Sequence, residues 1–98
     1  MSDDLRDTSD ASLVMAISRY HQDALAEAYR RHAGAVFGLA RRLLNDATLA
    51  EEIVQEVFLR LWKSAPRYEV KAKFTTFLFT IARNLVFNET RRKQRRKE

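Results

Sequence analysis

The residues with the clearest chemical potential lie in the last quarter of the chain, residues 73–97, which read KFTTFLFTIARNLVFNETRRKQRRK. Polar side chains recur there at every third or fourth position: Thr76, Thr80, Asn84, Asn88 and Arg91, with Arg83 and Arg92 beside them. From residue 83 to residue 98, seven arginines and lysines stand against two glutamates, a net +5 that equals the formal charge of all 98 residues. Amides hydrogen-bond base edges and cations neutralise phosphates, so this local charge is typical of a binding surface for an anionic partner.

The same stretch carries a second pattern that predicts how it is positioned. Its apolar residues also recur at spacings of three and four: Phe74, Phe77, Leu78, Ile81, Ala82 and Leu85. As a helix, these residues form one broad apolar face. We therefore expect a helix over residues 73–97 that buries one side and exposes amides, hydroxyls and cations on another.

An acidic patch is predicted on the preceding helix, residues 48–63. It comprises Glu52, Gln55, Glu56 and Leu59, with no basic residue before Arg60. Ile53, Val54, Val57, Phe58 and Leu61 form the apolar stripe of the same helix. Considered alone, the patch is typical of a solvated helix face, and the residues by themselves do not assign it a partner.

Composition restricts the class of protein. Ninety-eight residues suit one small domain, and two glycines, one proline and few β-branched runs favour helices over strands. The absence of cysteine excludes disulfides and thiolate chemistry, and no apolar run approaches the roughly 20 residues of a membrane span. The acidic start of the chain is unlike a secretory signal. We expect a soluble, intracellular, all-α domain.

No catalytic or cofactor site is recognisable. His21 and His32 are eleven residues apart with no acidic residue at ligand spacing, and there is no glycine-rich loop to hold phosphate. The serines and threonines lack a base partner. We expect a protein that is not an enzyme and that has no cofactor and no metal.

The predicted fold is a compact bundle of one short and three longer helices in residues 10–92, after a disordered acidic segment, residues 1–9, and before a basic linker start, residues 93–98. Ser9 or Asp10 caps the short helix, and residues 23–44 form the second helix. Leu25, Tyr29, Val36, Ala40 and Leu43 form its predicted stripe. Gly34 and Gly38 suggest close approach of another helix, and Thr48 with Glu51 has the spacing of a capping box.

Three interpretations of the basic helix are open on the residues alone. It binds nucleic acid, it lies on an anionic membrane, or its aromatic residues serve the core and its cationic end is disordered. The interleaved asparagines and threonines favour nucleic acid over a membrane, because a membrane-bound helix has no use for amide readout.

Two segments resemble a known family. The combination of AEEIVQEVFLRLW at residues 50–62 and KFTTFLFTIARNLVFNETRR at residues 73–92 is similar to region 2 of bacterial sigma factors, most of all the extracytoplasmic-function (ECF) group. The upstream segments SDASLVMAISRY and DALAEAYRRHAGAVFGLARRLLND resemble that family's opening helices. The resemblance covers residues 10–92. It departs from the family at Phe77, where many members carry tryptophan.

The resemblance implies a promoter-recognition domain that helps to start transcription. In the family, the acidic helix docks on the clamp helices of the largest catalytic subunit of the RNA polymerase core, a role that falls here on Glu52, Gln55, Glu56 and Leu59. The loop at residues 66–73 would receive a base flipped from the promoter −10 element, and the following helix would hold the non-template strand as the duplex opens. The residues implied in base recognition and melting are Tyr68, Lys71, Lys73, Phe77, Thr80, Asn84 and Asn88. Those implied in phosphate contact are Arg83, Arg91 and Arg92.

The resemblance also implies a cytoplasmic, nucleoid-associated bacterial protein, with an anti-sigma factor as a further partner. The family's helix-turn-helix domain for the −35 element has no counterpart within these 98 residues. We therefore expect an excised domain of a longer factor. The alternative is a helical protein-interaction or membrane-surface module whose basic helix has no base specificity.

Overall fold

The computed structural model describes residues 5–67 and 73–97. These residues form four α-helices: α1 (Asp10–Ile17), α2 (Gln22–Leu44), α3 (Ala47–Ser64) and α4 (Phe74–Lys97). Single 3-10 turns lie at Leu5–Asp7 and Ala65–Arg67. No strand occurs in the described part of the chain, and the prediction of an all-α fold with one short and three longer helices is confirmed.

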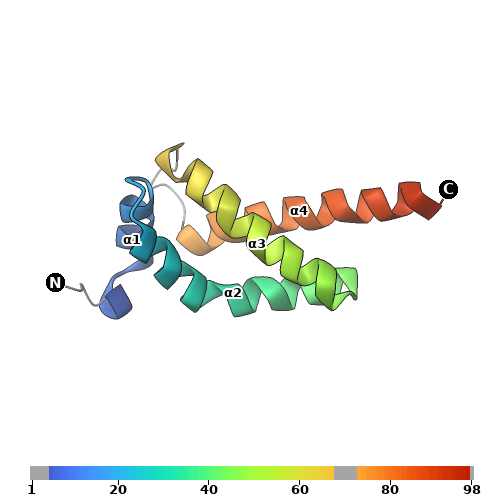
Figure 1. The fold of residues 1–98 in the computed structure, drawn as a ribbon, viewed down its shortest axis with the longest axis horizontal. Helices are drawn as coiled ribbons and strands as arrows, with labels where there is room; N and C mark the ends of the chain where they lie inside the picture. The colour runs from blue at the N-terminus through green and yellow to red at the C-terminus, as the bar shows by residue number, and fades with distance from the viewer. Residues whose placement is uncertain (1–4, 68–72, 98) are drawn as a thin grey trace.

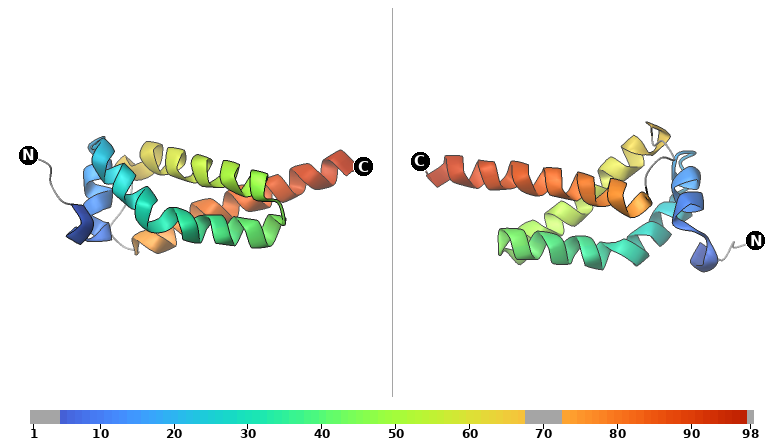
Figure 2. Two further views of the ribbon diagram at one scale, coloured as in Figure 1. Left: turned by 60° about the horizontal axis from the view of Figure 1, so that its bottom comes forward. Right: turned by 180° about the vertical axis from the view of Figure 1, so that it is seen from behind.

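The helices form a bundle from which one end of α4 projects (Figure 1). Helices α2 and α3 are antiparallel and lie side by side, joined by the short turn at Asn45–Asp46, and α1 packs near the first turns of α2 (Figure 2). Helix α4 crosses this pair, and its last turns extend beyond the α2–α3 turn in each view. The longest dimension of the molecule, 54 Å, follows from this projection. The most basic part of the chain is therefore the part least covered by other helices.

The core draws apolar side chains from all four helices. Leu13, Ile17, Leu61 and Leu78 are fully buried. The stripe predicted for α3 is confirmed, since Ile53, Val54, Val57, Phe58 and Leu61 are all buried. Burying one large apolar side chain contributes about 1.5–3 kcal/mol. The buried side chains of α3 and α4 therefore hold these two helices against the rest of the bundle.

The helix ends are capped by side chains next to them. Ser9 Oγ accepts from Ser12 N at 3.1 Å at the start of α1, as predicted. Asp46 Oδ1 accepts from Leu49 N at 3.0 Å at the start of α3, so the predicted capping box of Thr48 and Glu51 is wrong. A carboxylate is a strong acceptor and suits the positive end of a helix. This explains why α3 begins at Ala47, one residue before the predicted start.

The glycines of α2 do not mark a close helix crossing. A Cβ atom built at Gly34 or Gly38 would meet nothing within 4 Å, so that prediction is wrong. Gly34 instead borders an open hollow of about 430 Å³ between α2 and α3, together with Tyr29, Phe37 and Gln55.

The buried stripe of α2 differs from the predicted one. Val36 and Ala40 are buried as expected, but Tyr29 and Leu43 are 47% and 56% exposed. The buried positions include alanines that lie one residue away, such as Ala28. Tyr29 lies at the rim of the α2–α3 contact, where its ring meets the Phe58 ring edge-on at 5.0 Å.

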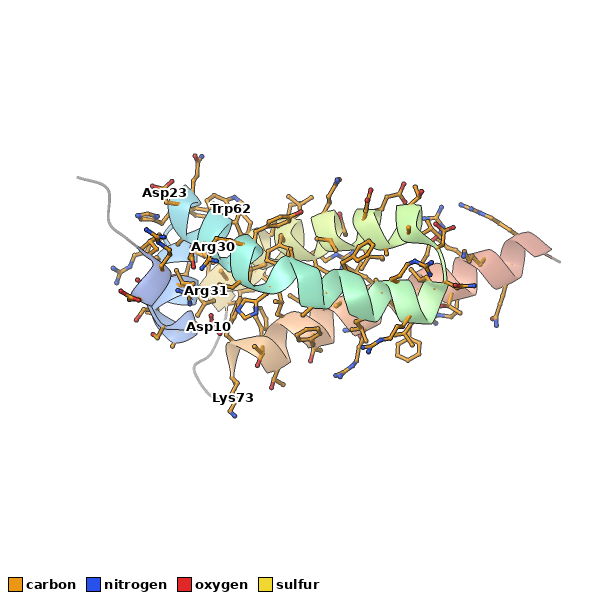
Figure 3. All side chains as sticks on the ribbon, turned by 90° about the horizontal axis from the view of Figure 1, so that it is seen from below. Asp10, Asp23, Arg30, Arg31, Trp62 and Lys73 are labelled. Atoms are coloured by element: carbon orange, nitrogen blue, oxygen red, sulfur yellow. The ribbon has the colours of Figure 1, made fainter. Side chains whose placement is uncertain are left out.

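Arg31 contacts the turn at Leu5–Asp7, which lies within the segment 1–9 that the sequence predicts to be disordered. The Arg31 guanidinium donates to the carbonyls of Leu5 (2.7 Å) and Arg6 (2.9 Å) and contacts Asp10 Oδ1 (3.3 Å) and Glu27 Oε2 (2.6 Å). Figure 3 shows Arg31 and Asp10 close together at this end of the molecule. At the other end of the domain, α4 continues through the predicted linker start to Lys97. The domain boundaries themselves remain predictions.

Glu27 is the one buried charged residue in the described part of the chain. Its carboxylate accepts two hydrogen bonds from Arg30 (2.9 and 2.7 Å) and one from Arg31 (2.6 Å). These bonds lower the pKa of Glu27 from 4.5 to about 2. The stabilisation that the ionised Glu27 carboxylate provides through Arg30 and Arg31 is therefore fully present above about pH 4.5 and is lost as the pH falls through about 2.

We expect Glu27→Gln to lower the urea midpoint near neutral pH, because the Arg30 and Arg31 guanidinium groups lose the carboxylate that they share. The difference from wild type should shrink between about pH 4.5 and about pH 2, where the wild-type carboxylate also becomes protonated. Urea unfolding followed by circular dichroism at several pH values measures this. Glu51→Gln, at an exposed site, is the control. An equal difference at all pH values would contradict the assigned pKa.

Candidate nucleic-acid and protein interfaces

The polar face of α4 is exposed along its whole length. Thr76, Thr80, Asn84, Asn88 and Arg91 are all exposed, whereas Phe74, Leu78, Ala82 and Leu85, on another side of the helix, are buried. The amphipathic pattern predicted from spacing is therefore confirmed for these residues, whereas Phe77 and Ile81 of the predicted apolar face are half-buried. Arg83 is also exposed, next to Asn84.

Hydrogen bonds within α4 determine what this face offers to a ligand. Thr80 Oγ1 donates to the Thr76 carbonyl at 2.8 Å, which leaves the hydroxyl oxygen as an acceptor. Arg91 Nη2 donates to Asn88 Oδ1 at 2.8 Å, so the Asn88 amide nitrogen points its two donors elsewhere. Within the described residues, the side chain of Asn84 makes no hydrogen bond. The face thus combines unused donors and acceptors, as readout of base edges requires.

Arg91 and Arg92 differ, although they are adjacent in sequence. Arg92 Nη1 lies 3.5 Å from Glu89 Oε2, so a neighbouring carboxylate partly neutralises its charge. Arg91 has no carboxylate partner in the described structure. Both arginines border an open hollow of about 570 Å³, together with Asn88, Gln94 and Arg95. Sequence reasoning did not select Gln94 and Arg95, although Arg95 follows Arg91 by four residues and so belongs to the same helical row.

The residues at the start of α4 are only partly described. Lys73 is exposed just before the helix (Figure 3), and its carbonyl accepts from Phe77 N at 3.2 Å. Phe77 is half-buried and packs against the core, so only part of its ring faces solvent. Tyr68 and Lys71, which the sequence selects for base recognition, lie outside the described residues.

The acidic patch on α3 is present as predicted, and the structure divides it. Glu52, Gln55 and Leu59 are exposed, and Glu56 is half-exposed, with its Oε1 3.3 Å from Arg60 Nε. Gln55 borders the hollow between α2 and α3. Glu52 and Glu56 instead border a groove between α3 and α4.

This second groove joins the two candidate surfaces. It has a volume of about 380 Å³ and is lined by Glu52, Glu56 and Arg60 from α3 and by Asn88, Glu89 and Arg92 from α4, among others. The sequence placed the acidic patch and the basic helix on separate elements and did not show that they meet. The two surfaces therefore share an edge.

The histidines have structural partners. His21 Nδ1 accepts from Ala24 N at 3.2 Å and caps α2. His32 Nε2 lies 3.1 Å from Asp10 Oδ1, and the ring meets Phe74 edge-on at 5.4 Å. The described residues contain no group of three or more histidines, cysteines or acids that could hold a metal ion.

These observations define a class: a small helical domain with a polar, cationic helix and an acidic patch on the adjoining helix. The Sigma-70 region 2 family model matches residues 28–96. The chain therefore belongs to the Sigma-70 region 2 family, as its resemblance predicted.

The chain is also similar to individual ECF sigma factors. It is 30% identical over 81 residues to the ECF RNA polymerase sigma factor SigW of Bacillus subtilis (83% of this chain, 43% of SigW). It is 34% identical over 94 residues to the ECF RNA polymerase sigma factor SigK of Mycobacterium ulcerans (95% and 48%). It is 40% identical over 63 residues to the RNA polymerase sigma factor CarQ of Myxococcus xanthus (64% and 36%). The chain spans about half the length of these relatives, or less.

Family membership confirms two further expectations. The family consists of transcription initiation factors, which agrees with the prediction that the chain is not an enzyme. Its relatives are of the ECF type, which agrees with the group that the motifs indicate. Within the described residues, no helix combines the length and apolar character needed to cross a membrane.

Proposed function

We propose that this domain recognises the promoter −10 element and holds its non-template strand open while docked on RNA polymerase. The observation that carries the proposal is the polar face of α4. It exposes Thr80, Asn84, Asn88 and Arg91 on the helix that the family model covers. The proposal extends to this chain what the names of its relatives state of them, that they are RNA polymerase sigma factors.

Strand opening on this surface requires no nucleotide hydrolysis. A protein that binds unpaired bases better than paired ones shifts the duplex equilibrium by its differential affinity for the open strand. Unstacking costs a few kcal/mol per base, which contacts to the exposed base edges and faces offset. Asn84 and Asn88 supply the amides for such contacts, and Arg83 and Arg91 supply charge for the phosphates beside them.

The α3 patch supports the second half of the proposal. Glu52, Gln55, Glu56 and Leu59 would contact the clamp helices of the largest catalytic subunit of the polymerase core. Leu59 is 46% exposed beside polar and acidic groups, so the patch offers an apolar contact with a charged surround. Because the α3–α4 groove borders both surfaces, polymerase docked on α3 would bring its clamp close to the strand on α4.

The proposal also covers the cellular location and the regulation of the protein. A factor of this kind acts in the bacterial cytoplasm at the nucleoid. Its expected regulator is a helical anti-sigma factor, which would block polymerase docking or strand binding by covering α3 or α4.

A salt titration tests the nucleic-acid half of this function. Each arginine that neutralises a phosphate of a single strand contributes about 0.7 to the slope of log K against log salt. We expect Arg91→Gln to reduce the slope for single-stranded DNA by about this amount. Arg92→Gln should reduce it by less, because Glu89 already pairs with Arg92.

Arg19→Gln is the matched control, since it removes the same charge from an exposed site beyond the end of α1. Fluorescence anisotropy of a labelled random-sequence oligonucleotide provides the readout. Slopes that stay unchanged in both α4 variants would refute the phosphate assignment, and no binding by the folded wild-type chain would refute strand holding.

A further inference from the structure

Phe87 is the most exposed large apolar side chain in the described part of the protein, at 65%. It lies on α4 between the buried residue Val86 and the exposed residue Asn88. Two other exposed aromatic residues have ring partners: Tyr20 meets Trp62 at 5.2 Å and Tyr29 meets Phe58 at 5.0 Å. Among the described residues, no aromatic ring contacts Phe87. The core therefore makes little use of this side chain.

The surroundings of Phe87 are polar and cationic. On a helix, residues three and four apart are neighbours on the surface, so Phe87 is adjacent to Arg83 and Asn84 on one side and to Arg91 on the other. All three are exposed. A flat apolar ring is thus placed among amide donors and guanidinium groups, on the face proposed to hold the strand.

This combination fits a nucleobase better than it fits a protein core or a lipid. Aromatic side chains bind single strands by stacking on the faces of bases, and arginines beside them contact the backbone. A lipid surface would bury Phe87 but would also have to desolvate the neighbouring Asn84 and Asn88 amides. An apolar protein surface would have to desolvate the flanking arginines as well. An unpaired nucleotide offers a base face to the ring, base-edge groups to the amides and a phosphate to the arginines.

We propose that Phe87 is a stacking platform for an unpaired base of the strand held by α4. The inference rests on the proposed function and adds a base contact that hydrogen bonding does not supply. Stacking tolerates any base, because every base has a π-face. Phe87 therefore contributes affinity for the open strand, while Asn84 and Asn88 on the same face contribute base choice.

The test measures binding of the whole chain to a labelled random-sequence single strand and to an abasic strand of equal length. Loss of a stacked base weakens binding by roughly five- to 100-fold. We expect Phe87→Ala and Phe87→Leu to lose affinity within this range for the base-containing strand and to bind the abasic strand as wild type does. Phe87→Trp should retain or increase affinity. Met15→Ala, which removes an exposed apolar side chain from α1, is the control.

The outcomes separate this inference from the function on which it rests. If Phe87→Ala binds normally while Arg91→Gln weakens binding, the stacking role is wrong and strand holding stands. If Phe87→Leu binds as wild type, the side chain acts through apolar area and the stacking role is also wrong. If Phe87→Ala affects only binding to anionic vesicles, the ring is a membrane contact. If the folded wild type binds no strand, both proposals fail. Circular dichroism establishes that each variant is folded.

Discussion

Replacing Gln55 and Glu56 together with alanine is expected to raise the Kd for the RNA polymerase core by roughly 30-fold or more. The two side chains are adjacent in sequence but face different hollows, Gln55 toward α2 and Glu56 toward α4. The double substitution therefore removes one polar side chain from the α2 side of α3 and one from the α4 side. Neither side chain is buried, so the fold should be retained.

Binding of the chain to immobilised polymerase core, measured by interferometry, provides the readout. Gln22→Ala with Asp23→Ala is a closely matched control, because it removes one amide and one carboxylate from exposed sites on α2. Equal loss in both double variants would show that net charge, and not the α3 patch, governs association. A double variant at Gln55 and Glu56 that binds as wild type does would remove the patch from the proposed interface.

The largest effect on stability is expected for Leu78→Ala. Leu78 is fully buried on α4, and truncation of a buried leucine costs about 2–5 kcal/mol through lost transfer energy and the cavity that remains. Small domains have total stabilities of about 5–15 kcal/mol, so this change removes a large part of the margin. Strand binding should weaken too, because the unfolded chain has no ordered α4.

Urea unfolding followed by circular dichroism measures this loss. Leu43→Ala is the control: it makes the same chemical change on α2 where the side chain is 56% exposed, and should alter stability by no more than about 0.5 kcal/mol. Similar losses for the two variants would mean that α4 does not pack as described.

The parts of the fold predicted correctly are those with a strong helical period. In α3, five apolar residues at spacings of three and four can share only one face, so the buried stripe followed directly. The same reasoning identified the exposed row of α4 through Asn84 and Asn88. Helix α2 behaved differently, because alanines and larger apolar residues surround much of its circumference. Which of its stripes is buried depends on how α3 crosses it, and spacing does not encode that angle.

Other features depend on contacts between residues distant in sequence. Arg31 contacts residues 21 to 26 positions away near the N-terminus, and Lys93 Nζ lies 3.5 Å from the Leu44 carbonyl, 49 positions away. No local pattern indicates such pairs.

At the candidate interfaces, the sequence predicted which residues share a face. It did not show that Glu89 pairs with Arg92, that Phe87 is exposed, or that α3 and α4 share a groove.

The central claim is that α4 prefers an unpaired strand. The most direct test compares the affinity of the folded chain for a random-sequence single strand with its affinity for the duplex of the same pool at one salt concentration. Tighter binding of the single strand is predicted, because the Phe87 ring can stack on the face of a base only when that base is unpaired, whereas amides can also reach base edges in a duplex groove. Equal affinity, or a preference for the duplex, would mean that α4 recognises only backbone charge, and would contradict the claim.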